Sequence, residues 1–172
     1  MVVGYMVREK DACEIIRLAA DANIRVYLDG GWGVDALIGR ETRIHQDIDL
    51  FAEGKDYNKF IDVIRNQGYS EIEMAYTTAN HTVWRDSDGR VIDLHRFEHL
   101  QDGNICYDGE CFPRHVFSGN GQIGGIPVLC IEPESQVLFH LGYEYDAKDL
   151  HDVKLLCEVF DIPVPDEYEG KL

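Results

Sequence analysis

Two aspartates separated by one apolar residue are the feature of this 172-residue sequence that most clearly points to chemistry. In the segment 47–50, Asp47 and Asp49 alternate with Ile48 and Leu50. Side chains on a β-strand alternate between its two faces, so on a strand both carboxylates would share one face. Neighbouring anions repel each other unless a positive charge lies between them. Because this pair offers oxygen ligands only, it predicts a site for a divalent cation such as Mg²⁺.

A second segment has the same design. Asp93 and His95 alternate with Ile92 and Leu94, so a strand here would again place the polar side chains on one face. If the two strands are neighbours in a sheet, three carboxylates converge and can hold one or two Mg²⁺ ions. Such ions stabilise the entering and leaving oxygens of a phosphoryl or nucleotidyl transfer. A carboxylate beside the entering hydroxyl can also accept its proton.

A pair of glycines, Gly30 and Gly31, separates a short apolar run at 25–29 from a helical pattern that begins at Trp32. Backbone N–H groups at a glycine turn before a helix bind phosphate oxygens. Glycine has no side chain, so the backbone can come close to a ligand. We therefore expect a sharp turn at this pair, with phosphate bound against it.

The elements that would position these residues are helices and strands of ordinary length. Apolar periodicity predicts amphipathic helices over 9–22 and 55–67, and turn residues at 87–89 predict a hairpin. The fold class is therefore α+β: a small mixed sheet with helices on one face, followed by a short helical C-terminus. The other expected elements are strands at 25–29, 44–52 or 46–52, 70–77, 81–86, 91–97 and 126–130; a hairpin at 104–112; a glycine-rich loop at 119–125; helices at 32–38, from 133 and at 147–160; and an unstructured tail after 161.

Length, charge and cysteine usage narrow the class of protein. A chain of 172 residues predicts one domain, 1–172. The net charge of −16 argues against nucleic acid as the main partner, because phosphate contacts need clustered Lys and Arg. No apolar run could span a bilayer and residues 1–10 lack a signal-peptide pattern, so we expect a cytoplasmic protein with no membrane partner. Five scattered cysteines without a C-x-x-C pair favour reduced thiols over zinc or a disulfide framework.

These motifs together resemble a known family. The segments G-G-W-G-V-D at 30–35, T-R-I-H-Q-D-I-D at 42–49 and I-D-L-H at 92–95 are similar to the nucleotidyltransferase superfamily with the DNA polymerase β-type core. Within it, the chain looks most like the small lincosamide and aminoglycoside-2″ nucleotidyltransferases of antibiotic resistance, and its segment 142–156 resembles the lincosamide enzymes. The resemblance covers most of the chain. It implies a polymerase β-type catalytic core over 1–112 and a C-terminal part, 113–172, that forms the substrate pocket and is helical.

The resemblance also implies a reaction and a role for each site residue. The reaction is the Mg²⁺-dependent transfer of AMP from ATP to a hydroxyl of a lincosamide, lincomycin or clindamycin, which releases pyrophosphate and inactivates the drug. Asp47 and Asp49 would bind Mg²⁺, and Asp93 would act as general base and as the third carboxylate of the metal site. The residues expected to bind the triphosphate are Gly30, Gly31, Arg43 and Lys148.

Several alternatives stay open at this point. The acceptor could be an aminoglycoside, or a protein or tRNA end as in toxin-type enzymes, although the acidity of the chain disfavours tRNA. A non-catalytic nucleotide-binding module is a further alternative, and a two-fold homodimer is expected by analogy with the superfamily. Near the motifs, five residues could be structural or could contact a ligand: Asp29, Trp32, Asp35, His45 and His95.

Overall fold

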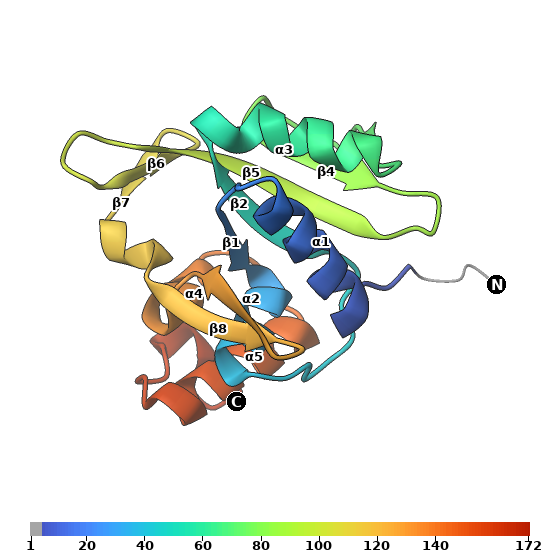
Figure 1. Ribbon diagram of the computed structural model, residues 1–172. Helices are drawn as coiled ribbons and strands as arrows, with labels where there is room; N and C mark the ends of the chain where they lie inside the picture. Colours follow the sequence, from blue (N-terminus) through green and yellow to red (C-terminus); the bar gives the residue numbers. More distant parts are fainter. Residues whose placement is uncertain (1–4) are drawn as a thin grey trace.

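One mixed β-sheet organises the protein, and the computed structural model describes it with its helices over residues 5–172 (Figure 1). The strands are β1 (Val26–Asp29), β2 (Ile48–Glu53), β3 (Ser70–Ile72), β4 (His81–Arg85), β5 (Val91–His99), β6 (Ile105–Tyr107), β7 (Glu110–Phe112), β8 (Gly119–Ile123) and β9 (Ile126–Cys130). Along the sheet they lie in the order β3-β4-β5-β2-β1-β9-β8, and the β6–β7 hairpin pairs with the end of β5. Strand β2 is parallel to β5 and antiparallel to β1.

Five α-helices and two short 3₁₀ helices accompany the sheet. They are α1 (Glu9–Asp21), α2 (Gly30–Ile38), α3 (Gly54–Asn66), α4 (Pro133–Phe139), α5 (Ala147–Phe160), η1 (Arg114–Phe117) and η2 (Asp166–Tyr168). Among residues 5–172, no helix has both the length and the apolar character needed to cross a membrane.

The main core lies between one face of the sheet and the helices α1 and α3 (Figure 1). Leu28, Leu50 and Leu94 occupy matching positions on β1, β2 and β5, and all three are buried there. The apolar stripe expected on the third helix, which includes Phe60 and Ile64, packs into this core. Because these apolar residues face the helices, the acidic residues beside them in the sequence must face the other side of the sheet. The α+β class with a mixed sheet is confirmed.

The second face of the sheet is covered differently. Tyr27, Phe51 and Phe97 form an aromatic cluster there with the segment that follows the β6–β7 hairpin. A third cluster joins α2 to α4 and α5. These two clusters leave part of the second face open, and the acidic residues lie in that opening.

The prediction of a glycine-rich loop at 119–125 is wrong, because residues 119–123 form β8, which pairs antiparallel with β9. Gly119 and Gly121 serve close packing, whereas Gly124 and Gly125 form the turn between β8 and β9. A side chain at Gly119 would come within 2.6 Å of the carbonyl oxygen of Cys130, and one at Gly121 would collide with the carbonyl oxygen of Ala36 in α2. Small residues in this strand therefore let it lie directly against α2.

Three other boundaries differ from the predictions. The strand expected over 70–77 ends at Ile72, and the strand expected to begin at 44 or 46 begins at Ile48. The expected sharp turn at 30–31 is the first turn of α2, which begins at Gly30. The tail, expected to be unstructured, contains η2 and the fully buried Tyr168, whose hydroxyl donates a hydrogen bond of 2.7 Å to the carbonyl of His140. A single aromatic anchor thus orders the tail.

The close approach of β8 to α2 gives a first stability prediction. Gly121→Ala should lower the free energy of unfolding by about 1–3 kcal/mol, because the new methyl group overlaps the backbone of Ala36 and the strand must shift. Gln122→Ala, at the exposed neighbouring position, should change it by less than about 0.5 kcal/mol. Urea unfolding of the two variants measures the difference. Equal stability of both would mean that β8 does not need a glycine at this position.

Candidate active site

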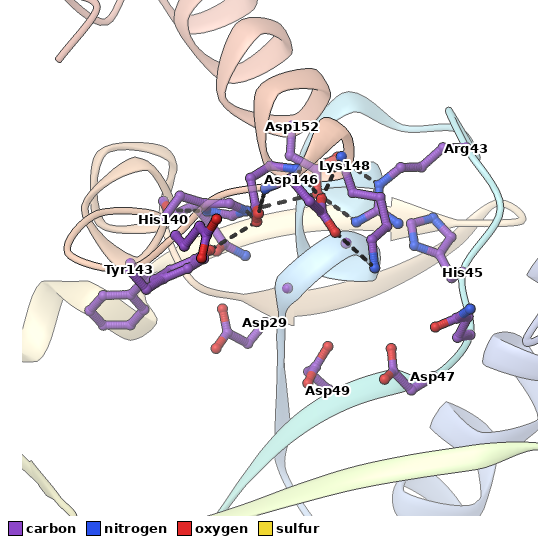
Figure 2. Close-up of a pocket in the computed structure, with 17 residues that line it drawn as sticks. Asp29, Arg43, His45, Asp47, Asp49, His140, Tyr143, Asp146, Lys148 and Asp152 are labelled. Carbon is purple, nitrogen blue, oxygen red and sulfur yellow. Dashed lines mark hydrogen bonds and ion pairs between the residues drawn. The ribbon is translucent and has the colours of Figure 1, made fainter. Parts of the chain in front are cut away.

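A row of carboxylates crosses the open part of the sheet. Asp29, Asp49 and Asp93 occupy matching positions on the adjacent strands β1, β2 and β5, so their side chains lie side by side on one face. Asp47 lies one residue before β2, two positions from Asp49. In Figure 2 the carboxylates of Asp29, Asp47 and Asp49 point into the same cavity, toward α5. The expectation that the two acidic segments are neighbouring strands is met, since β2 and β5 pair in parallel.

The proximity of these carboxylates changes their protonation. Burial, and next to it the charge of Asp49, raises the pKa of Asp29 to about 6. Burial raises the pKa of Asp47 to about 7, with the charges of Asp49 and Asp93 adding to the effect. The pKa of Asp93 is also raised, by burial first and then by Asp49. All three shifts show that the site disfavours bare negative charge and favours a bound cation.

The two glycines let the backbone of α2 approach the carboxylates. Gly30 has a φ of +57°, and a side chain on it would collide with the carboxylate of Asp49. A side chain on Gly31 would collide with the Arg43 guanidinium and the His45 ring. Asp29 occupies the N-cap position of α2, but its side chain makes no capping hydrogen bond. The first N–H groups of α2 thus lie at the wall of the cavity, where an anion can accept hydrogen bonds from them.

Two basic residues line the same cavity of about 450 Å³ (Figure 2). The Arg43 guanidinium donates to both oxygens of the buried Asp152, at 2.9 and 2.6 Å, and to the carbonyl of Ile44. Since three of its five N–H groups are used in this way, two remain to bind an anion. Lys148, at the start of α5, is half-exposed and lies 3.5 Å from Asp146. Lys148 and Asp152 are four residues apart on α5, a spacing that allows an ion pair on the helix surface. This ion pair does not form, because Asp152 binds Arg43.

A second cavity, of about 550 Å³, adjoins the first, and the two share Asp29 and Phe139 in their walls. Its lining is mainly aromatic and aliphatic, in contrast to the charged first cavity. The side chains that give it this character are Phe51, Ile105, Tyr107, Phe112, Phe117, Leu138, Phe139 and Leu141. His95 also lines it, two residues from Asp93 on β5. Asp29 therefore borders both a polar and an apolar compartment, Asp47 and Asp49 border the polar one, and Asp93 lies with Asp47 in the wall of a third cavity.

The structure gives a role to three of the residues that, on sequence alone, could be structural or could contact a ligand. Asp35 and His45 are buried and hydrogen-bonded to each other at 2.6 Å. Asp35 also accepts hydrogen bonds from the backbone and hydroxyl of Thr42, so it orders the loop before β2 and lines neither cavity. His45 lines the first cavity as well as holding this loop. Trp32 is 1% exposed and belongs to the core, so of the two roles considered for it the structural one is correct.

The sequence motifs did not assign a role to Asp29, and they did not indicate His81 at all. Asp29 directly precedes the glycine pair on a strand, a position from which its carboxylate could have been placed beside the others. His81 hydrogen-bonds to Asp93, and no motif indicated it, because only the pairing of β4 with β5 brings the two together. The apolar cavity likewise depends on segments far apart in the chain.

The raised carboxylate pKa values predict that stabilisation by Mg²⁺ depends on pH. The folded pKa of Asp47, about 7, lies above the ordinary value of 3.8 for an aspartate. Its contribution to stability is therefore complete below about pH 4 and is lost as the pH rises through about 7. A bound cation replaces the proton, so Mg²⁺ should raise Tm more at pH 8 than at pH 5.5, by a few degrees. Differential scanning fluorimetry measures both shifts. Equal shifts at the two pH values, or a shift that persists in Asp47→Asn, would contradict the assignment.

Known proteins resemble this chain over most of its length. The family model for aminoglycoside-2″-adenylyltransferases matches residues 11–156. A lincosamide resistance protein from Staphylococcus haemolyticus is 32% identical over 159 residues, which is 89% of this chain and 96% of that protein. A 2″-aminoglycoside nucleotidyltransferase from Klebsiella pneumoniae is 43% identical over 42 residues, 24% of each chain.

Solved structures share the fold. A lincosamide antibiotic adenylyltransferase with lincomycin bound superposes with a TM-score of 0.79 and 28% identity, over 90% of this chain and 99% of that one. ANT(2″)-Ia in complex with adenylyl-2″-tobramycin gives a TM-score of 0.74 at 22% identity, over 88% of both chains, a likeness in fold alone. The resemblance seen in the sequence is thereby confirmed. The chain is a nucleotidyltransferase and belongs to the aminoglycoside-2″-adenylyltransferase family.

Proposed function

We propose that this protein transfers AMP from ATP to a hydroxyl of a lincosamide antibiotic such as lincomycin or clindamycin, with release of pyrophosphate and inactivation of the drug. The observation that carries the proposal is that Asp29, at one end of the carboxylate row, lines both a charged cavity and an apolar one. A nucleotidyl transfer needs a triphosphate and an acceptor on either side of the same acidic groups. The named function of the lincosamide resistance relative, which aligns with 89% of this chain, supports the choice of acceptor.

The nucleotide side of the reaction belongs to the charged cavity. The N-terminus of α2 at Gly30 and Gly31 would donate backbone hydrogen bonds to the triphosphate. Arg43, with two N–H groups to spare, and Lys148, which lines the same cavity, would compensate its charge. Both cations would also stabilise the pyrophosphate that leaves.

The residues present fit Mg²⁺ as the cofactor. The donor set of Asp47, Asp49 and Asp93 is made of carboxylate oxygens, which hard cations prefer, and the raised pKa values of Asp47 and Asp93 show that positive charge would relieve their repulsion. Mg²⁺ bound there would supply electrostatic stabilisation of the charge that develops during transfer. The chain's own contribution is to fix these oxygens on two rigid, paired strands.

Asp93 is our choice for the general base. It lies at the edge of the row nearest His81 and His95, and its raised pKa makes it a better proton acceptor than an ordinary aspartate. An acceptor hydroxyl brought beside its carboxylate would lose its proton to Asp93 as the oxygen attacks phosphorus. Asp49, between Asp93 and Asp29, would bind the cation.

The apolar cavity is the proposed acceptor site. Its volume of about 550 Å³ is in the range of pockets for small organic ligands. A lincosamide joins an apolar alkylated ring to a hydroxyl-rich sugar, so its apolar part would pack on Phe112 and Phe139 while its sugar reaches the carboxylates. Several lining residues come from the segment 113–172, which we accordingly propose as the substrate-pocket part of the single domain.

An aminoglycoside is the second candidate acceptor. The net charge of −16 and the acidic lining of the first cavity, with Glu144, Asp146 and Asp149, favour a polycationic ligand. A direct test incubates the protein with Mg²⁺, each of the four nucleoside triphosphates in turn, and lincomycin, clindamycin or tobramycin. Mass spectrometry should show one added nucleoside monophosphate on the lincosamides with ATP. Modification of tobramycin alone would replace the first candidate by the second, and no modified drug would refute both.

Lys148 gives a prediction specific to nucleotide binding. Lys148→Met should raise the KM for ATP by about 10-fold, because a charge-assisted contact to phosphate contributes about 1–2 kcal/mol at a half-exposed position. Lys154→Met is a matched control, since Lys154 lies on the same helix with a similar exposure of 52% and does not line the cavity. Steady-state kinetics at saturating acceptor distinguish the two. An unchanged KM in Lys148→Met would remove this residue from the triphosphate site.

A further inference from the structure

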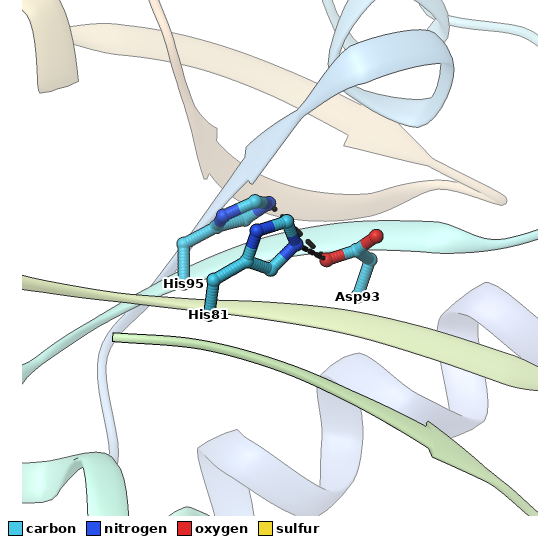
Figure 3. A group of neighbouring side chains, drawn as sticks. All are labelled: His81, Asp93 and His95. Atoms are coloured by element: carbon cyan, nitrogen blue, oxygen red, sulfur yellow. Dashed lines mark hydrogen bonds and ion pairs between the residues drawn. The ribbon is translucent and has the colours of Figure 1, made fainter. Parts of the chain in front are cut away.

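Two histidines and one aspartate form a compact group beside the carboxylate row (Figure 3). His81 on β4 and His95 on β5 are direct cross-strand partners, so their side chains project from the same face. Their ring centroids are 4.2 Å apart, and both rings face the carboxylate of Asp93. Because all three residues lie on paired strands, the backbone holds the group in place without any ligand.

The donor atoms of this group are spaced for one small ion. One ligand atom from each of the three residues lies within 4.8 Å of the others. Nε2 of His81 hydrogen-bonds to Oδ1 of Asp93, and Nε2 of His95 is 3.5 Å from that oxygen. Ligands about 2.0–2.1 Å from a tetrahedral zinc ion are about 3.3 Å apart. Small side-chain rotations would therefore bring the three atoms around one ion.

The neighbours of His95 orient it as metal-binding histidines are oriented. Its Nδ1 is 2.9 Å from the hydroxyl of Tyr107, and its ring stacks on Phe51 at a centroid distance of 4.7 Å. When Nδ1 donates its proton to Tyr107, the lone pair of Nε2 faces Asp93 and also Asp49, 3.9 Å away. A hydrogen bond from the outer ring nitrogen is the usual means of fixing the tautomer of a metal ligand.

We propose that His81, Asp93 and His95 form a binding site for a transition-metal ion of the zinc class, which competes with Mg²⁺ for Asp93. Two imidazole nitrogens and one carboxylate suit Zn²⁺, whereas Mg²⁺ prefers oxygen ligands. Asp49 or a solvent molecule completes the coordination. The side chain of His81 is 20% exposed, so an ion can reach the group from solvent. Binding displaces the proton of the His81–Asp93 hydrogen bond into solvent.

One consequence rests on the function proposed above. Zn²⁺ on Asp93 would displace Mg²⁺ from this carboxylate and lower its basicity, so Zn²⁺ should inhibit nucleotidyl transfer and excess Mg²⁺ should relieve the inhibition. His81→Asn should be less sensitive to Zn²⁺ than the wild type. The binding itself is measured without turnover, so a failure of the proposed reaction would leave the metal test intact.

The test is a titration of the full chain with Co²⁺, followed by visible absorption, and with Zn²⁺, followed by calorimetry, in the absence of nucleotide. One equivalent of Co²⁺ should give the intense visible bands of a four-coordinate ion with nitrogen ligands. His81→Asn and His95→Asn should each weaken binding by more than about 10-fold, and Tyr107→Phe, which removes only the outer hydrogen bond, by about 10-fold. His99→Asn is the matched control, since His99 is an exposed histidine on the same strand, and it should bind as the wild type does.

Two outcomes would overturn the proposal. Absence of a visible Co²⁺ spectrum together with absence of Zn²⁺ binding would show that the three residues hold no such ion. Binding of equal strength in the wild type and in both histidine variants would show that the ion lies among the aspartates alone. Circular dichroism and Tm of each variant confirm that folded proteins are compared, and His81→Gln replaces His81→Asn if the latter does not fold.

Discussion

Asp49→Asn should lower kcat by about 10³-fold or more and, at the same time, raise the thermal stability of the metal-free protein. The loss of activity is expected because Asp49 is the central member of the carboxylate row and the amide is a much weaker ligand for a divalent cation. The gain in stability is expected because burial, and next to it the charge of Asp49, raises the pKa of Asp29, Asp47 and Asp93. Removing that charge relieves the repulsion, and Tm should increase by a few degrees.

Asp62→Asn on α3 is the control for this experiment, because it makes the same chemical change at a side chain that is 74% exposed. It should leave kcat unchanged and move Tm very little. Kinetics and calorimetry on both variants are sufficient. Wild-type turnover in Asp49→Asn would exclude the metal-ligand role, and a lower Tm would mean that Asp49 is held by favourable contacts that exceed the repulsion.

Asp152→Ala should be the most destabilising single substitution in the wall of the charged cavity. Asp152 is 1% exposed, and both its oxygens accept hydrogen bonds from Arg43. Nε2 of His140 lies 3.8 Å from Oδ2 of Asp152. Its removal leaves a largely buried guanidinium without its partner, which costs about 3–5 kcal/mol in comparable buried pairs. For a chain of this size the expected decrease in Tm is on the order of 10 °C.

The same pair predicts a difference at acid pH. Burial alone would raise the pKa of Asp152, but the hydrogen bonds from Arg43 and His140 more than offset it, so the pKa is lowered. A carboxyl whose folded pKa is lowered stabilises the protein above its unfolded pKa, about 3.9, and loses that contribution as the pH falls through the folded value. The stability difference between the wild type and Asp152→Ala should thus shrink below about pH 4. Burial would lower the pKa of His140, but Asp152 raises it, so the difference should also shrink as the pH rises through the pKa of His140.

A double replacement, Arg43→Met with Asp152→Leu, checks the interpretation of this pair. It removes both charges and fills similar volume, so it should recover most of the stability lost in Asp152→Ala, although not the binding of the triphosphate. Chemical unfolding at several pH values provides the data. A double variant as unstable as Asp152→Ala would indicate that the pair does more than neutralise two buried charges.

The acidic site could be predicted from the sequence because a strand imposes a period of two on its side chains. Alternation alone assigned Asp47, Asp49 and Asp93 to polar faces, and the same alternation assigned Leu50 and Leu94 to the core. Neither inference needs knowledge of the rest of the molecule. The glycine pair was recognised in the same way, from its place between a strand and a helix.

Features that depend on register or on distant packing could not be found in this way. His81 reaches Asp93 only because β4 pairs with β5 in one register, and a shift by one residue would turn its ring to the other face. Gly121 looked like part of a loop because the sequence does not show that α2 lies against it. The order of the tail depends on the pocket that receives Tyr168, which helices α4 and α5 build together.

The distribution of the site along the chain has a consequence for how the protein folds. The carboxylates lie between residues 29 and 93, whereas Lys148 and the partner of Arg43 belong to α5. A partly folded chain that has formed β1, β2 and β5 but has not docked α5 already brings the mutually repelling carboxylates together. It still lacks the positive charge of Lys148 that would partly neutralise them. Divalent cations in the medium would stabilise such an intermediate, so Mg²⁺, the proposed cofactor, should also accelerate refolding.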